Sequence, residues 1–203
     1  MISINRPAVR AIASVLALAL PALAVTIAPS DAAHSGVPTA TVSDVIPAYA
    51  PDNVSDDVLW IARGIYSETK QPHEQELVAW VLRNRVETAY RGQRTYEGVV
   101  TDPYQFSAFN PGSSKRRLYT SLTPQSESAG WTRALEIAHT VYHSDESFRP
   151  FPQKTRHFYS ERSMVGGKTP KWAIGEEPVR LTGFRVDPRR FRFYNGLAAM
   201  VRL

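Results

Sequence analysis

Hydrophobic residues recur every three or four positions in three stretches of the chain, and each stretch predicts an amphipathic helix. The first stretch begins at a capping residue, Asn53 or Ser55, and ends at Glu68. Its apolar face consists of Val58, Leu59, Ile61, Ala62, Ile65 and Tyr66. Glu68 lies on the margin of that face, at the helix end where the helix dipole disfavours negative charge. A carboxylate in that place requires a structural or a chemical reason.

The second predicted helix begins at Pro72, because proline suits the first turn of a helix. Its buried stripe consists of Leu77, Val78, Val81, Leu82, Val86 and Ala89. The third is predicted to start at the pair Thr123-Pro124 and to run to about His143. Between them, residues 90–120 are irregular apart from a short helix at 96–100, and long irregular segments inside domains are usually functional or mobile.

Alternating, aromatic-rich segments follow the third helix and predict short strands. They are Thr155–Ser160, Leu181–Val186 and Phe191–Tyr194, with Trp172 between the first two. The pattern as a whole therefore predicts a mainly α domain with a few short strands lying across its helices.

The N-terminus has the layout of a secretory signal peptide. Arg6 and Arg10 precede or begin a small, apolar run that Pro21 interrupts, and Ala32 ends a suitable cleavage site. An uncleaved membrane anchor is the alternative. We expect a signal peptide at 1–32, a flexible linker rich in small residues, Pro, Ser and Thr at 33–52, and one domain at 53–203. The mature protein would be exported to the periplasm, the cell wall or the medium.

The amino-acid composition excludes several kinds of catalytic and binding chemistry. The chain of 203 residues carries a net charge of +5 and has no cysteine, which excludes thiol catalysis, disulfides and Cys-zinc sites. The positive charge favours an anionic partner such as nucleic acid, a membrane surface or an acidic wall polymer, but a solvated basic surface is the simpler explanation. Like charges form no run of five or more, so a nucleic-acid partner is not expected.

Several catalytic motifs are missing from the sequence. It has no nucleophile-elbow serine, Walker motif or dinucleotide fingerprint. His139 and His143 have the spacing of zinc ligands on a helix, but Thr140 stands where a zinc peptidase has its catalytic glutamate. We therefore expect no metal and no cofactor.

Glycoside cleavage requires only a carboxylic acid that stays protonated near neutral pH. Glu68 could be such an acid, although a glutamate at a helix end is usually a plain surface charge. The segment Tyr104–Phe109 carries aromatic and amide groups that suit a sugar site, although its aromatics could instead fill the core.

An ordered series of blocks then resembles the SleB-type cell-wall hydrolase family, the spore-cortex-lytic group. The blocks are residues 62–68, 78–86, 99–100, 105–107, 157–159, 170–172 and 191–194. Together they extend from about Ser55 to Tyr194. The resemblance implies a lysozyme-like or lytic-transglycosylase-like, mainly helical α+β fold, and it makes Glu68 the catalytic acid.

The resemblance also implies the reaction and its substrate. The enzyme would cleave the bond between N-acetylmuramic acid and N-acetylglucosamine in peptidoglycan glycan strands, as a lytic transglycosylase that leaves a 1,6-anhydro ring. We expect a monomer without a membrane span after cleavage of the signal. The candidate glycan-binding residues are Gln105, Phe106, Ser107, His157 and Tyr159.

Four alternatives stay open. A muramidase-type hydrolase would enlist a second carboxylate, for which Glu74, Glu97 and Asp102 are candidates. A catalytically silent wall-binding module, a zinc peptidase and a nucleic-acid-binding protein are the others. The chain also departs from the family pattern at Thr69–Pro72 and at Trp80, which predicts an altered groove beside Glu68.

Overall fold

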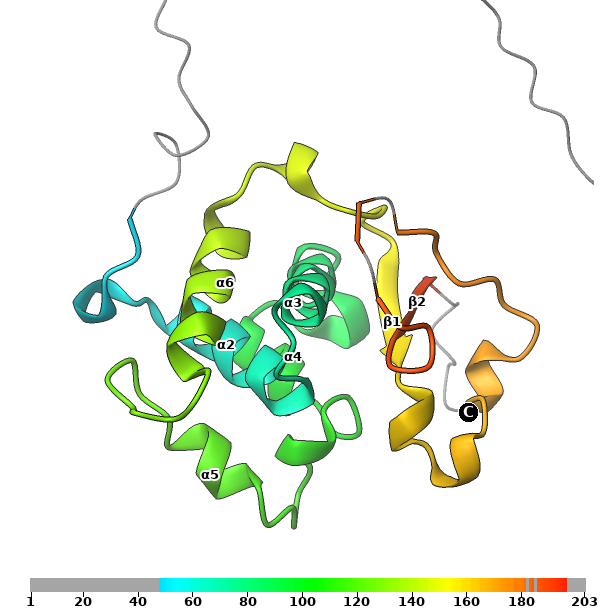
Figure 1. The fold of residues 1–203 in the computed structure, drawn as a ribbon, viewed down its shortest axis with the longest axis horizontal. Helices are drawn as coiled ribbons and strands as arrows, with labels where there is room; N and C mark the ends of the chain where they lie inside the picture. The colour runs from blue at the N-terminus through cyan, green and yellow to red at the C-terminus, as the bar shows by residue number, and fades with distance from the viewer. Residues whose placement is uncertain (1–47, 182, 185, 197–203) are drawn as a thin grey trace, which may run out of the picture. The chain divides into compact units, whose positions relative to one another are not determined.

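A computed structural model describes residues 48–181, 183–184 and 186–196 (Figure 1). The predicted signal peptide, linker residues 33–47 and residues 197–203 lie outside the described residues. In the described ranges, no helix combines the length and the apolar character needed to cross a bilayer.

The described part of the chain is mainly helical, which confirms the predicted class at that level. Its α-helices are α2 (Asp56–Glu68), α3 (Pro72–Glu87), α4 (Tyr96–Thr101), α5 (Arg116–Thr120) and α6 (Trp131–His143). Two short strands, β1 (Thr155–Tyr159) and β2 (Arg192–Asn195), pair antiparallel. Single 3₁₀ turns are η1 (Pro51–Asn53), η2 (Tyr90–Gly92), η3 (Ser107–Phe109), η4 (Glu146–Phe148), η5 (Glu161–Ser163), η6 (Val165–Gly167) and η7 (Lys171–Ala173).

Helix α2 begins and ends where its sequence predicts. The Ser55 hydroxyl accepts a hydrogen bond from the Val58 amide at 3.3 Å and caps the helix. Thr69 then turns to an extended conformation, while its amide still donates to the Ile65 carbonyl. Glu68 is therefore the last helical residue, as predicted.

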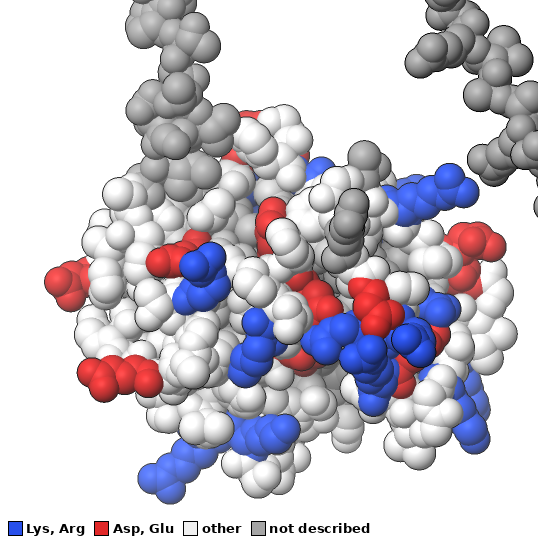
Figure 2. All heavy atoms as spheres, viewed as in Figure 1, with Lys and Arg blue, Asp and Glu red and all other residues white. Residues whose placement is uncertain are grey.

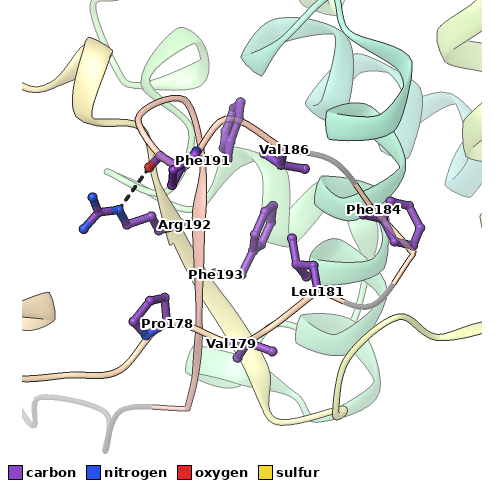
Figure 3. Close-up of a pocket in the computed structure, with 9 residues that line it drawn as sticks. Pro178, Val179, Leu181, Phe184, Val186, Phe191, Arg192 and Phe193 are labelled. Carbon is purple, nitrogen blue, oxygen red and sulfur yellow. Dashed lines mark hydrogen bonds between the residues drawn. The ribbon is translucent and has the colours of Figure 1, made fainter. Parts of the chain in front are cut away.

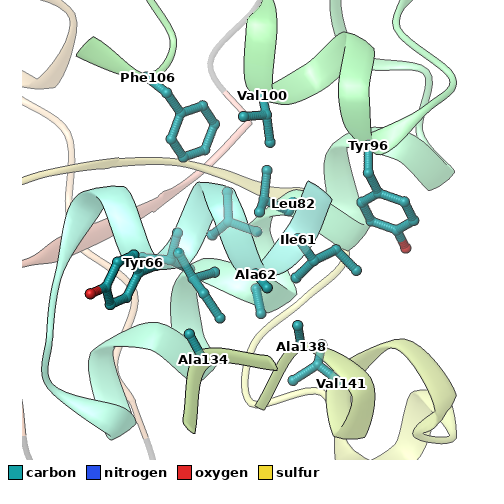
Figure 4. Packing of buried hydrophobic residues seen from close by; sticks show 14 of the residues in the cluster. Ile61, Ala62, Tyr66, Leu82, Tyr96, Val100, Phe106, Ala134, Ala138 and Val141 are labelled. Carbon is teal, nitrogen blue, oxygen red and sulfur yellow. The ribbon is translucent and has the colours of Figure 1, made fainter. Parts of the chain in front are cut away.

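The core forms where α2 packs against α3, α4 and α6 (Figure 4). Gly64 permits the close approach of these helices, since a Cβ atom there would lie 3.0 Å from Val100 and 3.1 Å from Leu82. Helix α3 is buried on more than one face, and Trp80 belongs to this core. Trp80 therefore acts in packing, and it does not border the pocket that contains Glu68.

The predicted start of the third helix is wrong. Residues 123–130 form a loop, and α6 begins at Trp131 after Gly130, whose φ is +75°. The Thr123 amide donates to the Ser126 hydroxyl at 2.9 Å, so Thr123 and Pro124 open a turn instead of a helix. The Trp131 indole donates to the Thr123 carbonyl at 2.7 Å and ties this loop to the helix.

The strand predictions at 155–160 and 191–194 are confirmed within a residue or two, but the described residues of 181–186 form no strand. Residues 182 and 185 lie outside the described part. Leu181, Phe184 and Val186 pack against the core as an irregular arm. Just before this arm, the Val179 amide donates a hydrogen bond to the Phe193 carbonyl of β2 at 2.8 Å.

Buried polar groups of α3 hold β1 beside the helices. The Asn84 side-chain amide donates to the Thr155 carbonyl at 2.8 Å, and the Arg85 Nε donates to the Arg156 carbonyl at 2.8 Å. These bonds fix the start of β1 against α3. The strand then runs to Tyr159, which lies beside the C-terminal end of α2.

Candidate functional site

A pocket of about 290 Å³ opens at the C-terminal end of α2. Segments far apart in the sequence form it, namely α2, the loop after α4, and β1 with the turn that follows. The residues lining it are Glu68, Tyr104, Gln105, Ser107, Asn110, Phe158, Tyr159, Ser160 and Ser163. Among these described residues Glu68 is the only acid, and the others offer hydroxyl, amide and aromatic groups.

Glu68 lies at this pocket with its carboxyl group largely surrounded by protein. Burial raises the pKa of Glu68 to about 7, and the positive charge of Arg85 opposes that rise. The end of α2 also presents carbonyl groups, which disfavour a negative charge. Glu68 can therefore hold a proton near neutral pH and release it, as a general acid must.

The loop from Tyr104 to Asn110 forms one wall of the pocket. Tyr104 has a φ of +66°, a left-handed conformation that residues other than glycine rarely adopt. Its amide donates to the Asn110 side-chain oxygen at 2.8 Å, which closes the turn. The Tyr104 side chain is 75% exposed, so its ring is free to contact a ligand at the rim.

Strand β1 and the turn after it form the opposite wall. The Tyr159 ring is buried and stacks on Tyr194 of β2, with ring centroids 5.9 Å apart. Trp172 packs edge-on against both rings, with its centroid 5.7 Å from Tyr159 and 5.4 Å from Tyr194. This aromatic packing fixes the wall, and the serine residues 160 and 163 extend it with hydroxyl groups.

The structure brings part of the predicted site together. Gln105, Ser107 and Tyr159 line the pocket with Glu68. Phe106 does not line it, since its side chain is fully buried and anchors the loop in the core.

His157 does not line the pocket either. Its Nε2 lies 2.8 Å from the Tyr90 hydroxyl. Burial, together with the charges of Arg85 and Arg156, lowers the pKa of His157 to about 4. A neutral imidazole that is bonded to Tyr90 acts here as a packing and hydrogen-bonding group behind the wall.

Five residues that line the pocket were not predicted from the sequence, namely Tyr104, Asn110, Phe158, Ser160 and Ser163. Tyr104 and Phe158 lie within segments that the aromatic pattern had singled out. Asn110 carried a weak signal, since an asparagine before Pro111 and Gly112 is typical of a turn. The two serines carried none.

None of the three candidates for a second carboxylate lines the pocket. Glu74 is buried and forms a two-pronged ion pair with Arg190, and Asp102 pairs with Arg91. Glu97 lies exposed on α4.

The Glu74–Arg190 ion pair also organises the segment at Thr69–Pro72. The Thr69 hydroxyl bonds to Glu74, and the Gln75 side-chain amide donates to the Thr69 carbonyl at 2.9 Å. Thr69 is buried as a result. Residues Thr69–Pro72 thus form a hydrogen-bonded connection directly after Glu68.

Two other surface features offer less chemistry. Figure 3 shows a second pocket, of about 330 Å³, whose described lining is apolar apart from Arg192. The rings of His139 and His143 lie 4.5 Å apart, but among the described residues no group of three or more potential ligands could hold a metal ion.

Charged side chains of both signs lie close together on the face drawn in Figure 2. Ion pairs account for part of this mixture between η5 and the segment at β2, where Arg162 bonds to Asp187 and Arg192 to Glu161. The described basic residues there are thus partly neutralised by neighbours.

Comparison with known proteins gives no relative: no family model, no curated protein and no solved structure matches this chain.

Proposed function

We propose that this protein is an exported peptidoglycan-cleaving enzyme of the SleB type, with a lytic-transglycosylase-like fold, in which Glu68 is the single catalytic acid. One observation carries the proposal. Glu68, whose pKa burial raises to about 7, is the only acid among the described residues that line a pocket of amide, hydroxyl and aromatic groups. Such groups suit a sugar, and the protonated carboxyl suits cleavage of a glycosidic bond.

The reaction uses Glu68 twice. Its proton passes to the oxygen that joins N-acetylmuramic acid to N-acetylglucosamine, as the bond from that oxygen to the muramoyl C1 breaks. The muramoyl 6-hydroxyl then bonds to C1, and its proton returns to Glu68. The products are a 1,6-anhydromuramoyl end and a free 4-hydroxyl on N-acetylglucosamine, and the acid is restored.

The absence of a second acid among the described lining residues favours this route over hydrolysis. Hydrolases that use two carboxylates place them about 5–9.5 Å apart across the bond. Glu74 and Asp102 are instead held by arginines. An internal hydroxyl nucleophile needs only the one carboxyl group that the pocket contains.

The direct test is the Glu68→Gln variant, with release of soluble muropeptides from purified peptidoglycan as the assay. Glutamine keeps the size and polarity of the side chain but cannot donate an acidic proton. We expect release to fall at least about 100-fold. Glu97→Gln on the exposed face of α4 is the matched control and should release muropeptides like the unmodified protein. Equal release by the two variants would contradict the proposal, and no release by the unmodified protein would favour a binding module.

A further inference from the structure

The guanidinium group of Arg85 lies buried behind the pocket, and its bond to β1 leaves part of its donor capacity unused. The residue is only 4% exposed, and it takes part in none of the ion pairs among the described residues. Its Nε donates to the Arg156 carbonyl, but its Nη1 is buried and has no hydrogen-bond partner in the described part of the chain. A buried charge with an unused donor is costly, which points to a functional reason for keeping it.

Aromatic rings hold the guanidinium in a fixed place. Its central carbon lies 5.5 Å from the ring centre of Tyr90, 5.6 Å from that of Phe106 and 5.7 Å from that of Phe158. Phe158 is also a lining residue of the pocket, so Arg85 lies directly behind a pocket wall. Contacts of this kind favour a cation and leave it little freedom to turn towards water.

The negative charges of two carboxylates, Glu68 and Asp102, favour the charged form of Arg85. Of the two, only Asp102 forms an ion pair with another described arginine. Asp102 pairs with Arg91, whereas Glu68 forms no ion pair within the described residues. Burial lowers the pKa of Arg85 to about 10, and Tyr90, Glu68 and then Asp102 oppose that change. Arg85 in turn opposes the effect of burial on Glu68.

The other charged or titratable groups around the pair come from three elements. Tyr119 on α5 feels the charge of Glu68. His157 on β1 stays neutral above a pH of about 4, because burial and the nearby charges of Arg85 and Arg156 lower its pKa. Arg91 stays charged, since its bond to Asp102 raises its pKa.

We infer that Arg85 is a positioning residue for Glu68, because its fixed positive charge stabilises the carboxylate that remains when Glu68 gives up its proton. The inference rests on the proposed function, in which Glu68 must release its proton and take one back in each turnover. Burial alone would raise the pKa of Glu68 further and so disfavour the release of its proton. The positive charge of Arg85 opposes that rise.

The test is the titration of the Glu68 carboxyl carbon by ¹³C NMR, assigned by its disappearance in Glu68→Gln. Arg85→Gln and Arg85→Met remove the charge, and glutamine can still donate to the Arg156 carbonyl. Both should raise the Glu68 midpoint by about one pH unit or more, and Arg85→Lys should raise it less. An unchanged midpoint in a folded, neutral variant overturns the inference.

A second measurement needs no change at Arg85, in case the neutral variants do not fold. The ¹⁵N resonance of the Arg85 Nε in the unmodified protein should titrate with the midpoint of Glu68, and it should be flat over that range in Glu68→Gln. No titration, or the same titration in both proteins, contradicts the inference.

These NMR measurements use no substrate, so their outcome is independent of whether the protein cleaves peptidoglycan. For an active enzyme, Arg85→Gln should also shift the alkaline limb of the pH–rate profile to higher pH, by as much as it shifts the Glu68 midpoint. A residue that only supports the fold would lower the rate without moving that limb.

Discussion

The carboxyl group of Glu68 has two properties that follow from its place in the chain. It ends a helix whose carbonyl groups repel a negative charge, and the fold buries it against two walls. Burial raises its pKa to about 7. Both the rate of the proposed reaction and the stability of the protein should therefore depend on pH around neutrality.

The rate of cleavage should fall as Glu68 loses its proton. Since only the protonated acid can start the reaction, kcat/KM should drop about tenfold between pH 6 and pH 8. A pH series with soluble glycan fragments measures this, with circular dichroism at each pH to show that the fold persists. A constant kcat/KM across this range would be incompatible with Glu68 as the acid.

Stability should fall between about pH 4.5 and pH 7. Glu68 keeps its proton up to about pH 7 in the folded protein, whereas its ordinary pKa is 4.5. The folded state therefore gains stability from this group that is fully present below pH 4.5 and is lost as pH rises through 7. The difference corresponds to at most about 3 kcal/mol.

Urea unfolding of the unmodified protein and of Glu68→Gln, at pH 4 and pH 8, isolates this contribution. Glutamine does not titrate, so the stability of the unmodified protein relative to Glu68→Gln should fall by up to about 3 kcal/mol between the two pH values. A difference that stays constant would mean that Glu68 titrates normally.

The connection between α2 and α3 fixes the position of Glu68 through one buried ion pair. Arg190, from the turn before β2, bonds to Glu74 of α3, and the Thr69 hydroxyl donates to Glu74. Glu74 is only 5% exposed, so removal of its partner would leave a buried charge uncompensated.

Arg190→Met should therefore lower the free energy of unfolding by about 2 kcal/mol, less than for a fully buried pair because the Arg190 side chain is 33% exposed. Arg189→Met is the matched control, since the Arg189 side chain is 72% exposed and 3.8 Å from Asp187. Denaturant unfolding measures both. Equal stability of the two variants would show that the Glu74 ion pair does not hold this connection.

Local patterns predicted the elements where local forces decide them. The capping residue Ser55 and the first-turn Pro72 mark α2 and α3 correctly. The helix start predicted at Thr123-Pro124 was wrong, because these two residues suit a turn as well as a helix start. The hydrogen bonds of Thr123 to Ser126 and Trp131 decide for the turn. The described residues of the segment 181–186 pair with no strand, so the alternation of the sequence does not make a strand of them.

The site could be predicted only in part, because it forms from segments that meet in three dimensions. Glu68 stood out as a charge at an unfavourable helix end. Phe106 and His157 lie next to lining residues in the sequence, but they face the core and a neighbouring aromatic group. Arg85 lies on a helix whose pattern shows no reason for a charge to be buried, and tertiary packing alone reveals it.

The described part of the molecule thus joins a helical core to an aromatic strand pair (Figure 1). Residues from both parts line the candidate pocket. This arrangement explains how the fold can bury one acid and still expose hydroxyl, amide and aromatic groups around it. The turn before β2 contributes through Arg190, and β2 contributes the Tyr194 ring that stacks on Tyr159.

Mass spectrometry of peptidoglycan digested by the mature protein tests the central claim most directly. A single acid in the pocket predicts 1,6-anhydromuramoyl ends, which are about 18 mass units lighter than reducing ends because no water is added, and predicts their loss in Glu68→Gln. Reducing muramic acid ends would contradict the single-acid mechanism, and anhydro ends that persist in Glu68→Gln would contradict the assignment of Glu68.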